Sequence, residues 1–283
     1  MSETATEVVQ AFRPAVAEVV QALRPAVAAR TKHVTLTALA GLPMVKPGDD
    51  LAALFAGALR CAGIAPADGD VLVVAQKIVS KAEGRFVDLA GVVPGARATK
   101  LAAEVCKDPR LVEVILSQSS EVVRHRKDVL VVAHRLGFVM ANAGVDQSNV
   151  APEGSEHVLL LPEDPDASAR SIKMRLDDAF GVNLGVVIND SFGRPWRQGV
   201  VGVALGAAGV PALRNLVGAP DLFGRKMRVT EVAVADEIAS AASLLMGESD
   251  EGVPAVLVRG VVFRDQPVPA SALIRPRELD MFR

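Results

Sequence analysis

The sequence predicts a mixed α/β protein, and three observations lead to that class. Continuous β-branched runs such as VLVVA at 71–75 are typical of buried strands. Apolar-periodic segments with a polar cap are typical of helices, and the segment after Asp49 is one of them. The two kinds of segment interleave along the 283 residues without strict βαβ regularity, which favours a mixed fold over a regular parallel sheet.

In the first half of the chain, alternating or continuous apolar residues predict strands, and only Lys127 and Asp128 separate the last two, as in a hairpin. In order, these strands cover residues 33–39, 71–75, 121–126 and 129–134. A loop, GLPMVKPG, follows the first strand. We expect Asp49 to cap a helix that ends at Gly63, and the stretch of roughly residues 97–118 to be rich in helix.

In the second half, the strand LGFVMA at 136–141 leads into the polar loop NAGVDQSN. A helix over 165–180 precedes the strand at 185–189. A helix over 231–246 and a strand over 255–260 follow late in the chain.

Composition excludes several classes of function. The net charge is -2, so no basic footprint indicates nucleic acid. Cys61 and Cys106 are too few for a disulfide framework and lack the spacing of a zinc site, so any metal would be a hard cation held by carboxylates. The longest apolar run, 200–213, is too short to cross a membrane, and the default location is cytoplasmic.

The first 30 residues hold a tandem repeat, with EVVQAFRPAVA at 7–17 and EVVQALRPAVA at 18–28. Pro14 and Pro25 would kink or break a continuous helix. We read residues 1–32 as an N-terminal extension that arose by a short duplication, with a partner-binding or dimer-stapling helix as the alternative. Residues 33–283 form the main predicted domain.

Four polar clusters come where apolar segments end, which is where α/β proteins commonly bind ligands. They cover residues 76–85, 142–149, 189–199 and 245–252. The cluster at 189–199, NDSFGRPWRQG, carries adjacent oxygen ligands, two arginines and the single Trp, which favours a functional role. The others can also be read structurally: a solvated charged loop at 76–85, an Asx-rich turn at 142–149, and a helix exit with a left-handed Gly247 at 245–252.

Known nucleotide motifs are absent from the sequence. Neither GxxxxGK[ST] nor GxGxxG occurs, and the GxSxG nucleophile elbow is missing too. Composition and spacing alone therefore indicate a metal-assisted enzyme that acts on anionic substrates through carboxylate, lysine and arginine side chains.

Five motifs in order give a closer match. GLPMVKPGDDL, VVAQKIVSKAEGR, ANAGVDQSNV, NDSFGRPWRQG and MGESDEG occur along about residues 33–265. Together they resemble the coenzyme F420-0:L-glutamate ligase family, in its stand-alone form. The resemblance implies a two-lobed fold that forms an intertwined homodimer. It also implies GTP as co-substrate, two Mg²⁺ or Mn²⁺ ions, and potassium as a further ion.

The resemblance implies a set of site residues. Asp146 and Asp190 would hold the first metal, and Ser191 and Glu248 the second. The nucleotide would lie against Leu42, Pro43, Met44, Val45, Gln76, Lys77, Lys81, Asn149, Met246, Gly247, Glu248, Ser249, Asp250, Glu251, Gly252 and Val253. For Arg194 and Arg197 the resemblance gives no role, and we expect them to meet the phosphate or carboxylate of the acceptor.

The implied reaction adds L-glutamate to coenzyme F420-0, a deazaflavin, through an acyl phosphate, and releases GDP and phosphate. Two alternatives stay open at this point. One is an amino-acid ligase for another carboxylate acceptor, and the other is a non-catalytic nucleotide-binding sensor. The apolar stretch at 200–206 is a departure, because relatives often carry polar residues near its start.

Overall fold

A computed structural model describes residues 32–150 and 155–281. It confirms the mixed α/β class. The tandem repeat lies outside the described residues, so its role and the division at residue 32 stay predictions. Among the helices described, none is long and apolar enough to cross a membrane.

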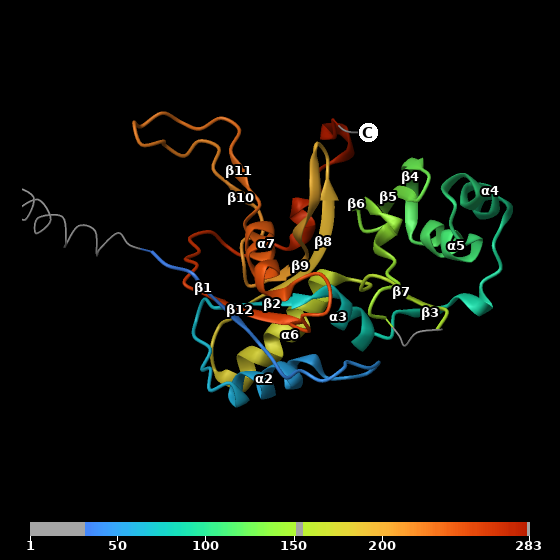
Figure 1. Cartoon of the computed structure of the whole chain (residues 1–283). Helices are drawn as coiled ribbons and strands as arrows, with labels where there is room; N and C mark the ends of the chain where they lie inside the picture. The colour runs from blue at the N-terminus through green and yellow to red at the C-terminus, as the bar shows by residue number, and fades with distance from the viewer. Residues whose placement is uncertain (1–31, 151–154, 282–283) are drawn as a thin grey trace, which may run out of the picture. The chain divides into compact units, whose positions relative to one another are not determined.

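A five-stranded sheet lies at the centre of the described chain from Thr35 onward (Figure 1). Its order is β1-β12-β2-β8-β9, and only the neighbours β2 and β8 run parallel. The strands are β1 (Thr35–Ala38), β12 (Ala255–Arg259), β2 (Val71–Ala75), β8 (Gly185–Arg194) and β9 (Arg197–Ala208). The first four residues of β2 are fully buried, which explains why its sequence is apolar without alternation.

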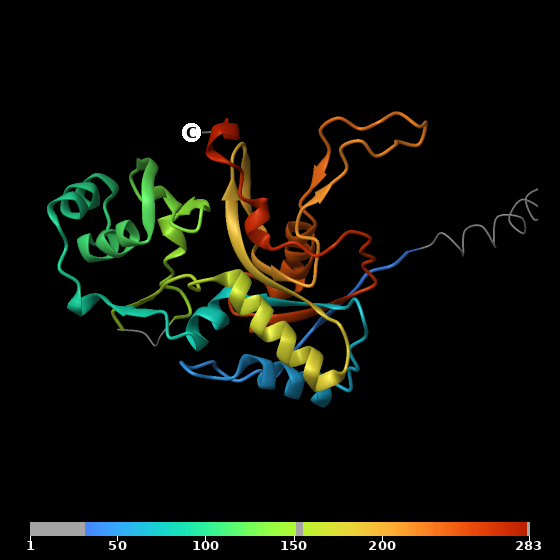
Figure 2. The ribbon, with the colours of Figure 1, turned by 180° about the vertical axis from the view of Figure 1, so that it is seen from behind.

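Helices cover both faces of this sheet (Figures 1 and 2). α2 (Leu51–Cys61), α3 (Gln76–Ala82) and α6 (Pro165–Phe180) share one hydrophobic core with one face. α7 (Val234–Met246) packs on the other face. The predicted bounds of α6 are confirmed, because Asp164 caps its first turn and Gly181 takes a positive φ of 68° at its end.

A separate hydrophobic core lies in the middle of the chain and gives the part from Thr35 onward two lobes. This lobe holds α4 (Ala96–Val105), α5 (Pro109–Ser117), β4 (Ser119–Arg126), β5 (Val129–His134) and β6 (Val139–Ala141). The predicted β4–β5 hairpin is confirmed. Short elements complete the described chain: β3 (Phe86–Asp88), β7 (His157–Leu159), β10 (Arg214–Asn215), β11 (Glu231–Val232) and the 3₁₀ turns Leu89–Gly91, Asn142–Gly144, Ala270–Leu273 and Arg277–Leu279.

Two predicted boundaries were wrong for local reasons. Asp50, not Asp49, caps α2 by accepting the N–H of Ala53 at 3.1 Å. The helix-rich stretch predicted at 97–118 is confirmed and holds two helices, because Cys106 adopts a left-handed conformation (φ 54°) after α4 and a second helix begins at Pro109. The helix predicted from residue 231 begins at Val234, because the two residues before Ala233 pair with β10.

Three further segments differ from their predictions. Residues 76–82 form α3, whose Val79 is buried in the core, so this cluster is helical rather than a solvated loop. The cluster at 189–199 forms a hairpin, because β8 and β9 stay paired up to Arg194 and Arg197. Of the strand predicted at 136–141, only residues 139–141 pair with β5.

Two glycines of β9, Gly202 and Gly206, allow close packing, and Gly206 gives a testable case. A Cβ at this position would clash with the backbone carbonyl of Pro165 at the start of α6. We expect Gly206→Ala to lower the free energy of unfolding by about 2–3 kcal/mol, measured by urea denaturation. Gly57→Ala is the control, because nothing lies within 4 Å of its Cβ position in α2. An equally stable Gly206→Ala variant would contradict this packing.

His134 should make stability depend on pH. Its side chain is buried, and Nδ1 accepts the N–H of Leu136 at 2.9 Å. Burial, aided by the charges of Arg135 and Arg85, lowers the pKa of His134 to about 4. In the unfolded chain a histidine titrates near pH 6.5, so the unfolded state takes up a proton first as the pH falls from about 6.5 to 4, and the fold loses stability.

We therefore expect wild-type protein to lose about 2 kcal/mol more stability than His134→Asn between pH 7 and pH 5. The Asn side chain retains a hydrogen-bond acceptor but does not titrate in this range. Urea denaturation at both pH values measures the difference. Equal losses in the two proteins would show that His134 does not carry this dependence.

Candidate functional site

The candidate site lies at the carboxyl end of the two parallel strands. β2 and β8 are paired from Val71 and Gly185 to Ala75 and Asn189, so both reach the same edge of the sheet. α3 begins directly after β2, and Asp190 and Ser191 continue β8. The sheet thus brings two of the four predicted clusters to one place.

The cluster at 142–149 meets α3 through two lysines. Lys77 Nζ lies 2.7 Å from Asp146 Oδ2 and donates to the carbonyl of Ser148 at 2.8 Å. Lys81 Nζ donates to the carbonyl of Asn149 at 2.7 Å. Four of the residues predicted from the sequence are therefore in direct contact with this loop or within it.

The segment after α7 contacts two of the other clusters. Asn149 Nδ2 donates to the carbonyl of Ser249 at 3.0 Å. Ser191 Oγ donates to Glu248 Oε2 at 2.8 Å. All four clusters of the sequence analysis are thus joined by contacts between residues that are up to 100 positions apart in the chain.

The carboxyl group of Asp190 has a strongly shifted pKa. Burial raises the pKa of Asp190 to about 7, and the negative charges of Asp146 and Glu248 act in the same direction. The backbone N–H of Ser191 and the ammonium of Lys77 oppose the rise.

Lys81 is a buried cation of the same site. Its side chain is 6% exposed, and within the part of the chain that the structure describes it forms no ion pair. Burial lowers the pKa of Lys81, and the neighbouring Lys77 lowers it further while Asp146 raises it. A buried ammonium held by a carbonyl is suited to an anion such as a phosphate.

The donor set fits divalent cations that keep much of their water. No group of three His, Cys, Asp or Glu side chains in residues 32–150 and 155–281 is close enough to hold a metal alone. Mg²⁺, however, commonly binds through one or two carboxylates, with water and phosphate oxygens as its other ligands. The predicted pairs, Asp146 with Asp190 and Ser191 with Glu248, supply carboxylate and hydroxyl oxygens of the kind that this mode uses.

The other predicted nucleotide contacts lie around this cluster. Gly48 donates its N–H to the carbonyl of Ala82 at 2.8 Å, which holds the loop with Leu42, Pro43, Met44 and Val45 beside α3. Met44 is 78% exposed, whereas Val45 is buried. Gln76 is buried too, and its Nε2 donates to Ser80 Oγ at 2.6 Å. The nucleotide roles of these residues stay predictions.

The turn after α7 has an unusual backbone. Gly247 has φ 69° and ψ -175°, so the predicted left-handed cap is wrong in ψ although φ is positive. A side chain at this position would clash with the carboxyl group of Glu251, whose Oε2 accepts the N–H of Ser249 at 2.8 Å. The turn therefore needs glycine there. The rest of the predicted set, Met246, Asp250, Gly252 and Val253, flanks this turn.

Arg194 and Arg197 lie at the tip of the β8–β9 hairpin, away from the cluster. Arg194 is four residues beyond Asp190 on an extended strand, a separation of about 13 Å along the backbone. Its Nη1 donates to the carbonyl of Gly199 at 3.4 Å, and Arg197 is exposed. This separation could not be inferred from the sequence, because the segment was expected to be a loop.

Two polar residues of the site had no predicted role. Ser148 Oγ donates to Asp146 Oδ1 at 2.9 Å and its carbonyl accepts from Lys77. Asn189 is buried, and its Nδ2 donates to Ser243 Oγ at 3.0 Å, while its Oδ1 has no hydrogen-bond partner in the described part of the chain. Both lie within predicted clusters, so cluster membership was the available signal.

Comparisons with known proteins show which family of sequences this chain resembles. A family model described as F420-0:Gamma-glutamyl ligase matches residues 41–260, which contain the four clusters. Coenzyme F420:L-glutamate ligase of Methanothermobacter thermautotrophicus is 47% identical over 252 residues, 88% of this chain and 99% of the relative. The protein of the same name from Methanopyrus kandleri is 48% identical over 243 residues, 84% of this chain and 93% of the relative. That from Archaeoglobus fulgidus is 46% identical over 228 residues, 81% and 88% respectively.

Proposed function

The chain belongs to the F420-0:gamma-glutamyl ligase family, and from that premise we propose that it joins L-glutamate to coenzyme F420-0 with GTP as co-substrate. The names of the relatives support the ligase and its two substrates. The joined cluster of carboxylates and lysines at the end of β2 and β8 is the observation that supports a phosphate-handling site.

The proposed reaction has two steps. Transfer of the γ-phosphoryl group of GTP to a carboxylate of F420-0 forms an acyl phosphate and GDP. The α-amine of L-glutamate then attacks the acyl carbon, forms the amide bond, loses a proton and releases phosphate. Activation is needed because a free carboxylate is a poor acyl donor.

The residues of the site divide these tasks by charge. Lys77 and Lys81 are proposed to bind phosphate oxygens, and Lys81 is available because its ammonium has a carbonyl as its partner. Asp146, Asp190, Ser191 and Glu248 are proposed to hold two Mg²⁺ or Mn²⁺ ions. When bound, such ions neutralise the crowded phosphate oxygens. Potassium as a further ion and a cytoplasmic location belong to the same proposal.

We also propose that the protein is a homodimer. Residues 216–230 form a long arm beyond the β10–β11 pair (Figure 1). The arm exposes large apolar side chains, since Leu222 is 100% exposed, Phe223 88% and Val229 85%. A second copy of the chain would bury them. Sedimentation of wild type and Leu222→Asp/Phe223→Asp would test this, with a monomeric wild type as the contradictory result.

A direct assay tests the ligase. Purified protein is incubated with GTP, Mg²⁺, L-glutamate and F420-0, and each component is left out in turn. Product that is heavier by one glutamyl residue, formed with equimolar GDP, would support the proposal. Product from another carboxylate acceptor alone would favour a different amino-acid ligase, and tight GTP binding without any turnover would favour a nucleotide sensor.

A further inference from the structure

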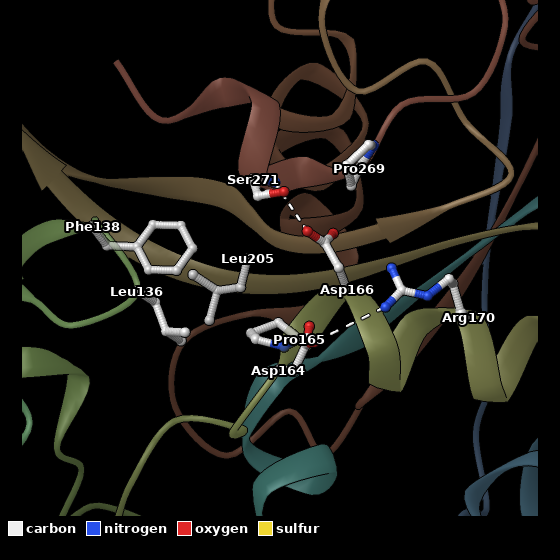
Figure 3. Close-up of a pocket in the computed structure, with 9 residues that line it drawn as sticks. All are labelled: Leu136, Phe138, Asp164, Pro165, Asp166, Arg170, Leu205, Pro269 and Ser271. Carbon is white, nitrogen blue, oxygen red and sulfur yellow. Dashed lines mark hydrogen bonds and ion pairs between the residues drawn. The ribbon is translucent and has the colours of Figure 1, made fainter. Parts of the chain in front are cut away.

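A cavity of 380 Å³ lies beside the candidate site, and four segments of the chain line it (Figure 3). They are the turn between β5 and β6, the first turns of α6, Leu205 of β9, and the segment around Pro269 and Ser271. The volume falls in the range of small-molecule pockets, about 300–1,000 Å³. None of the lining residues belongs to the predicted nucleotide or metal set.

The cavity has two chemically different walls. Leu136, Phe138 and Leu205 form an apolar side, while Asp166 and Arg170 lie on the opposite side in Figure 3. Asp166 is fully engaged with the backbone, because its carboxylate accepts the N–H groups of Ala207, Ala270 and Ser271 at 2.8–3.1 Å. Asp166 therefore holds the backbone of this wall in place, and we expect a ligand to form its polar contact with another residue.

Arg170 is the available polar partner. Its Nη2 lies 4.0 Å from Asp164 Oδ2, a loose ion pair, and its side chain is 55% exposed. A pair of this exposure contributes little, so the guanidinium can turn toward an anion at low cost. Its planar array of donors suits a carboxylate or phosphate group.

The apolar wall adjoins the strand that carries Asp190. Phe138 stacks edge to face on Phe192, with ring centroids 6.0 Å apart. Phe192 is two residues after Asp190 in β8, so the two side chains point to the same face, about 7 Å apart along the strand. Leu205 lies across from Ile188 and Asn189, at the register shift between β8 and β9. A ligand in the cavity can therefore direct one end toward Asp190.

We propose that this cavity binds the acceptor, with its flat ring system against the apolar wall and an anionic group at Arg170. The inference rests on the proposed function and adds the place where the acceptor is held. Of the three substrates, L-glutamate offers little apolar surface, and the nucleotide is proposed to lie against α3 and residues 246–253. An amphipathic acceptor is the substrate that matches an apolar wall opposite a polar wall whose available donor is Arg170.

Two variants test the proposal without disturbing the core. Ser271→Trp fills the cavity from an exposed position, and its backbone N–H to Asp166 is retained. Arg170→Gln removes the guanidinium. Arg175→Gln is the matched control, because it lies on the same helix with the same 55% side-chain exposure and pairs with Asp50. The Kd of F420-0 is measured by calorimetry, and KM is measured for all three substrates.

We expect both variants to raise the Kd and KM of F420-0 about tenfold or more, as the loss of a charge-assisted hydrogen bond or of pocket volume implies. KM for GTP and L-glutamate should stay near the wild-type values, as should all constants of Arg175→Gln. Unchanged F420-0 binding in Ser271→Trp, or a rise in KM for GTP or glutamate instead, would overturn the inference. A wild type that forms no glutamylated product would reject the proposed function itself.

Discussion

Replacing Asp190 by Asn should lower kcat for glutamate ligation by about 100-fold or more. The variant removes a negative charge from the proposed pair with Asp146, which weakens cation binding where phosphoryl charge must be neutralised. Steady-state assays at saturating GTP, Mg²⁺ and both other substrates measure the effect. Asp178→Asn on the exposed surface of α6 is the matched control and should retain wild-type activity.

The same variant should not be less stable. Because burial raises the pKa of Asp190 to about 7, its ionised form costs stability as the pH rises from about 4 to 7. The asparagine side chain carries no charge, so metal-free Asp190→Asn should unfold at the same or a higher urea concentration than wild type at pH 8. Near-normal activity would reject the metal assignment, and a clear loss of stability would show that the activity loss reports misfolding.

Replacing Asp166 by Ala should lower the free energy of unfolding more than any other substitution proposed above. Its carboxylate accepts three backbone N–H groups, from Ala207, Ala270 and Ser271. The side chain is buried, so the three donors would lose their partner away from bulk water. We expect the free energy of unfolding to fall by about 3 kcal/mol or more, measured by urea denaturation.

A second substitution separates the hydrogen bonds from general packing. Asp166→Asn keeps the oxygen that serves Ala207 and Ala270 and replaces the oxygen that serves Ser271, so it should cost about 1–2 kcal/mol. Asp178→Ala, an exposed change on the same helix, should cost much less. Equal stability of the Ala and Asn variants would contradict the graded role of the carboxylate.

Elements with strong local signals were predicted well. α6 matches its predicted bounds because Asp164 and Pro165 begin it and Gly181 ends it, all within one segment. β2 matches because five consecutive apolar residues form a strand that is buried on both faces.

Elements that depend on distant partners were not predicted. Residues 190–194 are mostly polar and were expected to form a loop, yet they continue β8 because Asp190 pairs with Val203 and Phe192 with Val201. Backbone pairing of this kind leaves no trace in local composition. α3 was missed for a related reason. Only two of its residues, Ile78 and Val79, are large and apolar, and most of the others are polar or charged.

The candidate site was also predicted only in those features that have a local signal in the sequence. Its four clusters could be recognised from the sequence as polar residues at the ends of apolar segments. That the four clusters lie together in the fold could not be recognised from the sequence, because contacts such as Asn149 to Ser249 join residues that are 100 positions apart. The cavity beside them was not predicted at all, because Leu136, Arg170 and Ser271 come from different parts of the chain and form no motif.

Phosphoryl activation of the acceptor is tested most directly by isotope transfer. F420-0 labelled with ¹⁸O in its reacting carboxylate is incubated with the protein, GTP, Mg²⁺ and L-glutamate, and the product and the released phosphate are analysed by mass spectrometry. An acyl-phosphate ligase gives a product with one added glutamyl residue and moves one ¹⁸O atom per turnover into phosphate. Unlabelled phosphate, or GDP release without glutamylated product, would contradict the proposed function of the site.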